Sequence, residues 1–238
     1  MQSSISRRTF ISMTGAAVAV PIIIASESVT PMLLDHILLG ANDLQQGIEF
    51  VEKHTGVRAA FGGVHPGRGT QNALLSLGER RYLEIIAPDP AQSEVKGRLG
   101  PRLLSLTEPK LVSWAAHPGT LTTFAASLRT RGFACAGPTP GSRQRSDGKL
   151  LQWQTLALDD DMDGLLPFFI EWSADTIHPS VDSPKGCSLL EFAAEAPESE
   201  KLQGELKKLT LDLPVLKGEK SRLVAKIGGP KGQFRFTS

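Results

Sequence analysis

The sequence predicts an α+β fold of two paired βαβββ modules, followed by a smaller C-terminal βαβββ-like unit. Three observations support this. The same order of one strand, one helix and three strands occurs twice in succession, each copy has a Gly/Pro-rich loop at the same place, and each ends in an apolar strand with a central glutamate. We expect the paired modules over residues 31–186, divided at about 109/110, and the extension over 187–238.

Residues 1–30 are interpreted as an export signal and not as part of the fold. Arg7 and Arg8 precede an apolar run over 11–25 that is too short for a comfortable membrane span. The stretch Ser-Arg-Arg-Thr-Phe-Ile over 6–11 resembles the twin-arginine motif, which implies the twin-arginine machinery as a partner and a periplasmic or otherwise exported location. No clean Ala-x-Ala follows, so cleavage near Ala25 and retention as a membrane anchor are both open, and a chance arginine pair is the alternative.

The first module shows the clearest signals for its elements. Asp43, with Gln46 three residues later, has the pattern of a capping box at a helix start. Gly56 is typical of the helix end. The expected elements are a strand over 33–39, a helix over 43–56, strands over 57–61, 72–77 and 81–87, and a Gly/Pro loop over 62–70.

The second module repeats this order. Its expected elements are a strand over 111–116, a helix from Thr120 to Gly132, strands over 133–136, 150–158 and 167–172, and a Gly/Pro loop over 137–141. Glu171 falls in its last strand as Glu84 falls in the last strand of the first module. A single strand glutamate is usually a solvated residue, but the repetition weakens that interpretation.

The C-terminal unit repeats the order more weakly. We expect a strand over 188–194, a helix beginning at Pro197 with an apolar stripe of leucines, and strands over 213–216, 222–227 and 233–236. It has no carboxylate at the place of Glu84.

Composition excludes several classes of protein. The 26 basic and 25 acidic residues are nearly balanced, which argues against a nucleic-acid or polybasic membrane surface. The two cysteines, Cys135 and Cys187, form no C-x-x-C pair, so a thiolate zinc site is not expected. A disulfide between them and two buried free thiols are both open. No nucleophile elbow, P-loop or dinucleotide fingerprint is present.

Four stretches carry a resemblance to a known family. They are LDHILLG from Leu34, HPGRGTQNALLSLGERRYLEIIAP from His65, PFFIEW from Pro167, and HPS from His178. Together with the paired modules they resemble the glyoxalase-like domain family of the vicinal oxygen chelate superfamily, over about residues 32–190. The resemblance implies a cup-shaped curved sheet that holds a divalent metal ion or a substrate. Both modules lie in one chain, so a monomer and a homodimer are both open.

The resemblance also implies a ligand set. His36 matches the first-strand metal ligand, and Glu84 and Glu171 match the last-strand ligands of the two modules. The fourth place falls on Ser113, a poor ligand, which departs from the full pattern. One imidazole and two carboxylates could still hold Mn, Fe, Ni, Zn or Mg. In addition, Glu171 could leave the metal and act as a catalytic base.

Strand alternation predicts how these three side chains lie. If the repeat is real, His36, Glu84 and Glu171 share the concave face and converge within metal-ligand or hydrogen-bond reach. Two adjacent buried carboxylates require a cation, which a metal ion or a protonated His36 would supply.

Loop residues supply further candidates. His65 is a candidate catalytic acid or base, and His178 is a candidate substrate-binding residue at the same rim; either could instead fix a turn. Asn72 and Arg68 are candidate substrate-binding residues, as hydrogen-bond donor and as cation, and Arg143 could also neutralise an anionic substrate. The alternative for all three is local hydrogen bonding or solvation.

These residues suggest two classes of function. The first is a metal-assisted lyase, isomerase or dioxygenase that acts on a small oxygen-rich substrate. The second is a metal-free protein that binds or sequesters a small molecule in the same cup, with tryptophans as aromatic surface.

Overall fold

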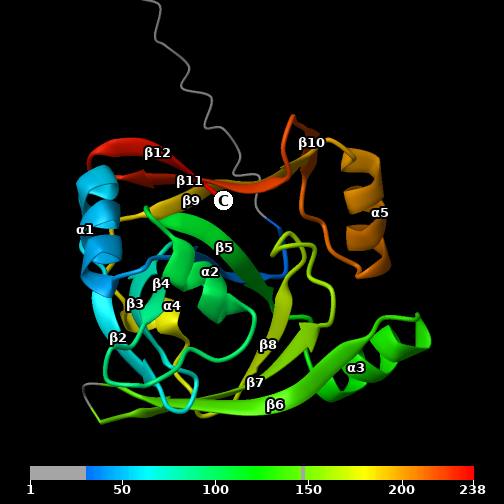
Figure 1. Ribbon diagram of the computed structural model, residues 1–238, viewed down its shortest axis with the longest axis horizontal. Coiled ribbons are helices and arrows are strands. Elements are labelled where there is room, and N and C mark those ends of the chain that lie inside the picture. The colour runs from blue at the N-terminus through cyan, green and yellow to red at the C-terminus, as the bar shows by residue number, and fades with distance from the viewer. Residues whose placement is uncertain (1–30, 146–147) are drawn as a thin grey trace, which may run out of the picture.

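The computed structural model describes residues 31–145 and 148–238, so the predicted signal over 1–30 lies outside the described residues. An eight-stranded sheet curls into a half-barrel, and a four-stranded sheet packs against its outer, convex side (Figure 1). The concave side of the half-barrel is not covered by this second sheet. The predicted α+β class is confirmed.

The first module has the expected elements: β1 (Leu34–Gly40), α1 (Leu44–Thr55), β2 (Ala60–His65), β3 (Thr70–Ser76) and β4 (Tyr82–Pro88). Helix α1 begins as predicted, because the side chain of Asp43 accepts a hydrogen bond of 2.8 Å from the N–H of Gln46. It ends at Gly56, whose φ of 83° is the left-handed conformation that glycine adopts without strain.

The second module contains β5 (Lys110–Ala116), α3 (Leu121–Thr130), β6 (Cys135–Gln144), β7 (Leu150–Leu158) and β8 (Phe168–Trp172). Its strands pair in the same way, so that the sheet order is β2-β3-β4-β1-β5-β8-β7-β6. The antiparallel pair of β1 and β5 joins the modules at the centre. The predicted pairing of two modules is therefore confirmed. One difference is that β2 and β6 extend into the Gly/Pro segments that we predicted as loops.

The C-terminal unit contains β9 (Ser188–Ala196), α5 (Ser199–Lys208), β10 (Val215–Lys217), β11 (Arg222–Gly229) and β12 (Gly232–Thr237). Its element order is the predicted one, but its strand order is β10-β9-β11-β12. After α5 the chain returns to the outer edge of β9 and adds β10 in parallel. In strand order the unit is thus not a third copy of the module.

The main core lies between the two sheets. Trp114 of β5 and Phe192 of β9 are fully buried and meet edge to face, with ring centroids 5.5 Å apart. The C-terminal sheet and the module helices cover the convex side, and the larger cavity lies on the concave side. Cys135 and Cys187 are both free thiols.

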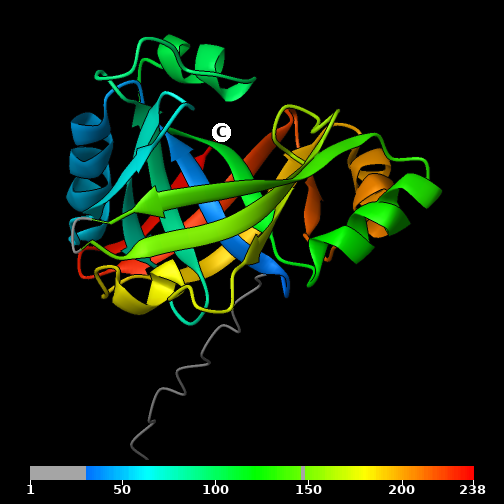
Figure 2. The same cartoon turned by 90° about the horizontal axis from the view of Figure 1, so that it is seen from below.

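Two short helices were not predicted. Helix α2 (Leu99–Ser105) belongs to the connection between the modules and lies across the mouth of the half-barrel (Figure 2). Its Leu103 packs with Leu38, Ile86 and Val112, a small apolar cluster on the concave side. Helix α4 (Pro179–Asp182) follows β8. Within residues 31–145 and 148–238, no helix is long and apolar enough to cross a membrane.

Candidate functional site

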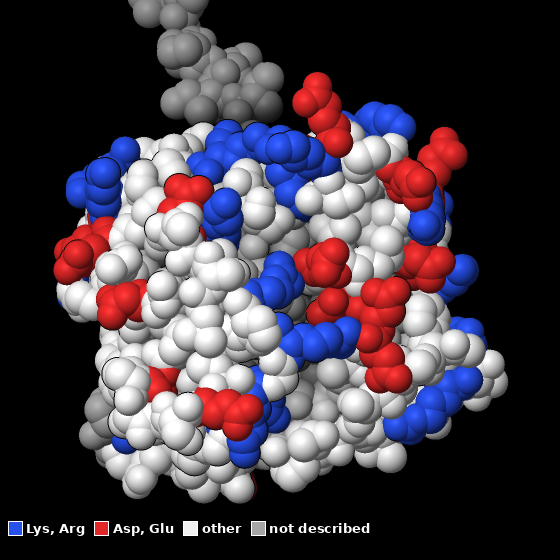
Figure 3. Space-filling view, in the orientation of Figure 1, with Lys and Arg blue, Asp and Glu red and all other residues white. Residues whose placement is uncertain are grey.

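The concave side of the half-barrel encloses a cavity of about 640 Å³, which is within the size range of small-molecule sites. Both modules line it, and the segment that leads into α2 closes part of its mouth. There Arg98 donates to the backbone oxygens of Leu158 and Asp159. Figure 3 shows basic and acidic side chains facing each other across a hollow in this face of the molecule.

His36 and Glu84 lie side by side at the base of this cavity. Strands β1 and β4 run parallel, with Leu38 of β1 paired to Glu84 of β4. The imidazole Nε2 of His36 is 3.4 Å from Oε2 of Glu84, and both residues are buried, with 2% and 8% of their surface exposed. The predicted convergence of these two side chains is therefore seen in the structure.

Asp35 lies behind His36 because of an irregularity in β1. Leu34 and His36 pair with consecutive residues of β5, so Asp35 is an extra residue, a β-bulge. Strict alternation would turn Asp35 away from His36, but its Oδ1 lies 2.7 Å from Nδ1 of the His36 ring. Asp35 is fully buried.

Three N–H groups surround the carboxylate of Asp35. Besides His36, Trp172 donates through Nε1 at 3.1 Å and His178 lies with Nε2 at 3.2 Å. The N–H of Ser180 donates to Nδ1 of His178, so Nε2 is the ring nitrogen that donates to Asp35. Burial raises the pKa of Asp35, but the hydrogen bonds from His178 and His36 outweigh it and hold that pKa well below its usual range.

An ionised Asp35 also fixes the tautomer of His36. A carboxylate accepts only, so Nδ1 of His36 carries the hydrogen of this bond. Nε2, which faces Glu84, is then the ring atom that can take up or release a proton. We call the row of three contacting side chains, Asp35, His36 and Glu84, the relay.

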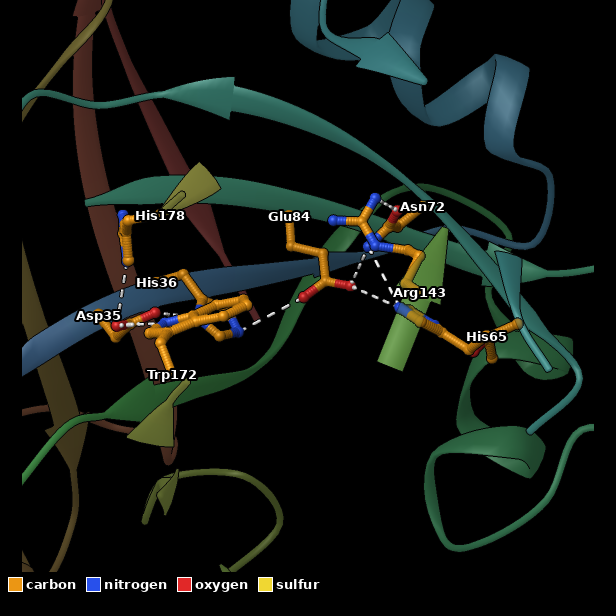
Figure 4. A network of polar contacts seen from close by, with 9 residues as sticks. Asp35, His36, His65, Asn72, Glu84, Arg143, Trp172 and His178 are labelled. Carbon is orange, nitrogen blue, oxygen red and sulfur yellow. Dashed lines mark hydrogen bonds and ion pairs between the residues drawn. The ribbon is translucent and has the colours of Figure 1, made fainter. Parts of the chain in front are cut away.

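Asn72, Arg143 and His65 surround the other side of Glu84 (Figure 4). Nδ2 of Asn72 donates to Oε1 of Glu84 at 2.7 Å, and Oδ1 of Asn72 accepts from Arg143 Nη1 at 3.1 Å. Nε2 of His65 is 3.9 Å from the same Glu84 oxygen. The amide orientation is consistent with its partners, since a flip would set oxygen against carboxylate and nitrogen against guanidinium.

These neighbours control two ionisation states. Burial raises the pKa of Glu84, but the positive charges that His36 and His65 carry when protonated, and the hydrogen bond from Asn72, lower it below its usual value. Burial lowers the pKa of His65, with Arg143 acting in the same direction and Glu84 against it. At neutral pH the site therefore combines an ionised Glu84 with a neutral His65.

The sequence over residues 34–210 matches the model of the glyoxalase-like domain family. The chain belongs to the glyoxalase-like domain family. The match continues past residue 186 through β9 and α5, so it includes part of the C-terminal unit. A search of curated protein sequences finds no significant match.

Solved structures are similar to this glyoxalase-like chain to different degrees. A hypothetical protein from Staphylococcus aureus matches with 16% identity and a TM-score of 0.56, over 85% of this chain and 84% of its own. Methylmalonyl-CoA epimerase from Mycobacterium tuberculosis matches with 20% identity and a TM-score of 0.41, over 63% and 92%. Methylmalonyl-CoA epimerase from Streptomyces coelicolor matches with 19% identity and a TM-score of 0.43, over 59% of this chain and 97% of its own. At these identities the similarity concerns the fold alone.

Glu171 does not join the site of the glyoxalase-like domain, and the predicted convergence with His36 and Glu84 is wrong. Its neighbours Ile170 and Trp172 line the cavity, whereas Oε2 of Glu171 accepts a hydrogen bond of 2.7 Å from the N–H of Leu121 on the other face of β8. The free N–H groups at the start of α3 draw the carboxylate outward.

Strand register explains the error. In the first module Leu38, two residues after His36, pairs with Glu84; in the second Ala115, two residues after Ser113, pairs with Phe168. Phe168 thus has the position in the second module that Glu84 has in the first. Glu171 is three residues further along β8, and an odd separation in a strand places its side chain on the opposite face. The second module offers Ser113 and Phe168 to the cavity and no carboxylate at the matching place.

The role of Glu171 is testable as a helix cap. Thr120 precedes α3 but makes no side-chain cap bond, so we expect Thr120→Ala to change stability little. Glu171→Gln should cost about 0.3–1 kcal/mol, because it removes a negative charge from the start of α3. Urea unfolding at pH 7 measures both. If Thr120→Ala cost more than Glu171→Gln, the capping role would be refuted.

The remaining predicted residues divide into two groups. His65 and Asn72 contact Glu84 and line the cavity, and Ser113 lines it as well. Arg68 is exposed at the rim, whereas His178 is buried behind Asp35 and is not among the cavity residues. His178 therefore holds Asp35 in place from a position that does not line the cavity.

The predicted metal centre does not fit the residues present. Its third ligand faces away, and the guanidinium of Arg143 brings a permanent positive charge to Glu84. Asn72 also occupies the oxygen of Glu84 that faces His65. Among the residues that the structure describes, no group of three or more His, Cys, Asp or Glu side chains is arranged to hold a metal ion.

Asp35 was not predicted as a site residue, and Trp172 was predicted only as part of an aromatic surface of the cup. The signal for Trp172 was available, because alternation places it with Ile170 on the opposite face from Glu171. Asp35 has no comparable signal, since its orientation depends on a bulge that pattern does not reveal.

Proposed function

We propose that this chain is an enzyme that removes and returns a proton at the carbon next to a carbonyl group of a small molecule. The observation that supports this is the buried relay of Asp35, His36 and Glu84, which opens on a cavity of about 640 Å³. A general base needs an ionised group within reach of the proton that it takes, and Glu84 meets that condition at the cavity base.

In the proposed step the C–H bond of the substrate breaks. Its proton goes to the carboxylate of Glu84, and its electron pair moves onto the carbonyl oxygen to give an enolate. His36 Nε2, 3.4 Å away, can share the proton, and the charge that this places on the ring is balanced by Asp35. The guanidinium of Arg143 stabilises the negative charge of the enolate. Return of the proton completes an isomerisation or an exchange.

The metal-assisted route expected from the family resemblance is not part of this proposal, because the predicted ligand set does not assemble. The second candidate function is ligand binding without chemistry. It is favoured by one observation: Trp153 and Trp172 line the cavity with ring centroids 5.6 Å apart and offer an aromatic surface.

The test is proton exchange with solvent. The protein is incubated in D2O with a panel of small ketones, aldehydes and carboxylic acids, and proton NMR follows the loss of the C–H signal next to the carbonyl group. Exchange that depends on Glu84 supports the enzyme. A panel member that binds, as seen by quenching of tryptophan fluorescence, but does not exchange would favour the binding protein.

We also propose that the chain is exported through its twin-arginine-type segment. The support is the sequence over 6–11 followed by the apolar run. We expect a chain with Arg7→Lys and Arg8→Lys to stay in the cytoplasm, because the twin-arginine machinery reads the arginine pair. Cell fractionation of the full chain in a bacterial host measures this, with Arg58→Lys as the control. Unchanged export of the doubly substituted chain would contradict the proposal.

A further inference from the structure

Arg143 reaches the site across the seam between the two modules. It belongs to β6, an edge strand of the second module, yet its Nη1 donates to Asn72 on β3 of the first. On the way it passes β2, the other edge strand, at Gly62 and Gly63. A Cβ at Gly62 would overlap both Nη1 of Arg143 and Oδ1 of Asn72, and one at Gly63 would lie 3.0 Å from Cδ of Arg143. The two glycines thus provide the room for this side chain.

The guanidinium is buried with most of its donors unused. Arg143 is only 3% exposed, and a guanidinium carries five N–H donors. Within residues 31–145 and 148–238, its single hydrogen bond is the one to Asn72, and its Nε is buried without any acceptor. A buried donor without a partner destabilises the protein, and more so when it belongs to a charged group. The cavity that Arg143 lines is the place from which a ligand can supply acceptors.

We propose that Arg143 binds the carboxylate of the substrate, and that the substrate is therefore a small monoanionic carboxylic acid. This rests on the proposed function and names its substrate class. The planar fork of a guanidinium matches the two oxygens of a carboxylate.

Local charge favours a monoanion. Glu84 already places one ionised carboxylate at the cavity base, and Asp35 places a second one behind His36. A phosphate group brings a charge of about −1.5 to −2, which would exceed what the one buried guanidinium balances. The other basic residues of the lining, Arg68, Lys96, Arg98 and Arg102, are exposed or half-buried. A single carboxylate adds less negative charge beside Glu84 than a phosphate does. The apolar remainder of such an acid has a wall to contact, formed by Leu38, Ile86 and Phe168.

The test is a binding measurement that needs no turnover. Isothermal titration calorimetry compares 3-phenylpropanoate, 3-phenylpropanamide and inorganic phosphate. We expect the wild-type protein to bind the carboxylate at least about tenfold more tightly than the amide, the order of one charge-assisted hydrogen bond, and phosphate more weakly than the carboxylate. Arg143→Gln should abolish the preference, and Arg143→Lys should retain part of it, since it keeps the charge but not the fork.

The matched control is Arg145→Gln, which removes the same charge from a residue two positions further along, outside the cavity residues. It should keep the preference. If circular dichroism shows that Arg143→Gln does not fold, the carboxylate preference is measured in Arg143→Lys and Gly62→Ala instead. Each of these variants keeps the positive charge but removes or displaces the planar guanidinium. Equal binding of acid and amide by the wild type, preference for phosphate, or an unchanged preference in the folded Arg143 variants would overturn the proposal.

Failure of this subsite and failure of the proposed function are distinguishable. Glu84→Gln should still prefer the carboxylate, because it removes a neighbouring negative charge. A carboxylate preference that depends on Arg143, without exchange of any acid, would refute the proton-transfer activity and leave the subsite. Exchange of neutral ketones, with no preference for acids in binding, would support the proton-transfer activity and refute the carboxylate subsite.

Discussion

Glu84→Gln is expected to lower the rate of solvent exchange by about 10²–10⁴-fold, the typical contribution of a general base. Glutamine has nearly the same shape, and its side-chain oxygen can still accept the bond from Asn72 that Oε1 of Glu84 accepts at 2.7 Å. What it loses is the capacity to take a proton from carbon. Proton NMR of the variant and the wild type, under the same conditions in D2O, measures the two rates.

The matched control for this variant is Glu171→Gln. Both glutamates lie in the last strand of their module, but Glu171 caps α3 from the opposite face. Its substitution should leave the exchange rate within about twofold, since its side chain lies on the face of β8 opposite to the cavity. Equal losses in both variants, or no loss with Glu84→Gln, would refute the assignment of Glu84 as the base.

The pH dependence of the exchange rate is a second test of Glu84 as the base. His36, His65 and Asn72 outweigh the effect of burial and lower the pKa of Glu84. The base therefore stays ionised as the pH falls below the ordinary value of about 4.3 for glutamic acid. The acidic limb of the exchange rate should lie below that value, as far as the protein remains folded.

The fold and part of the site could be predicted from sequence because they depend on local pattern. The order of strands and helices follows from periodicity and caps, as Asp43 and Gly56 show. His36 and Glu84 were found because the family resemblance matches both positions, and strand alternation puts them on the same face of the parallel neighbours β1 and β4. These are properties of one module, which a sequence shows directly.

The rest of the site depends on features that pattern does not fix. Asp35 faces the site only because of the bulge in β1, and Glu171 faces away because the last strands of the two modules differ in register by an odd number. Arg143 was a candidate anion binder from sequence, but its contact with Asn72 needs the curl of the whole sheet, which brings edge strands β2 and β6 together at Gly62.

Asp35→Asn is expected to destabilise the protein by about 3–5 kcal/mol at pH 7, the usual cost of removing one partner from a buried ionic cluster. Asp35 is fully buried and accepts from His36, Trp172 and His178. An asparagine at this place has one acceptor oxygen and turns an NH2 group toward ring N–H groups. The loss of hydrogen bonds is therefore joined by a donor-to-donor contact. Guanidinium unfolding measures the difference.

The dependence on pH separates this charge effect from simple misfit. The hydrogen bonds from His178 and His36 depress the folded pKa of Asp35, although burial opposes them. A depressed pKa contributes stability that is present above the unfolded value, about 3.9, and is lost as the pH falls toward the folded value. The wild-type advantage over Asp35→Asn should therefore shrink between pH 5 and pH 3. Asp43→Asn is the control, because asparagine caps a helix as well as aspartate does, and it should cost little at either pH. A gap between wild type and Asp35→Asn that stays constant over this range would mean that shape alone, and not the charge of Asp35, holds His36 in position.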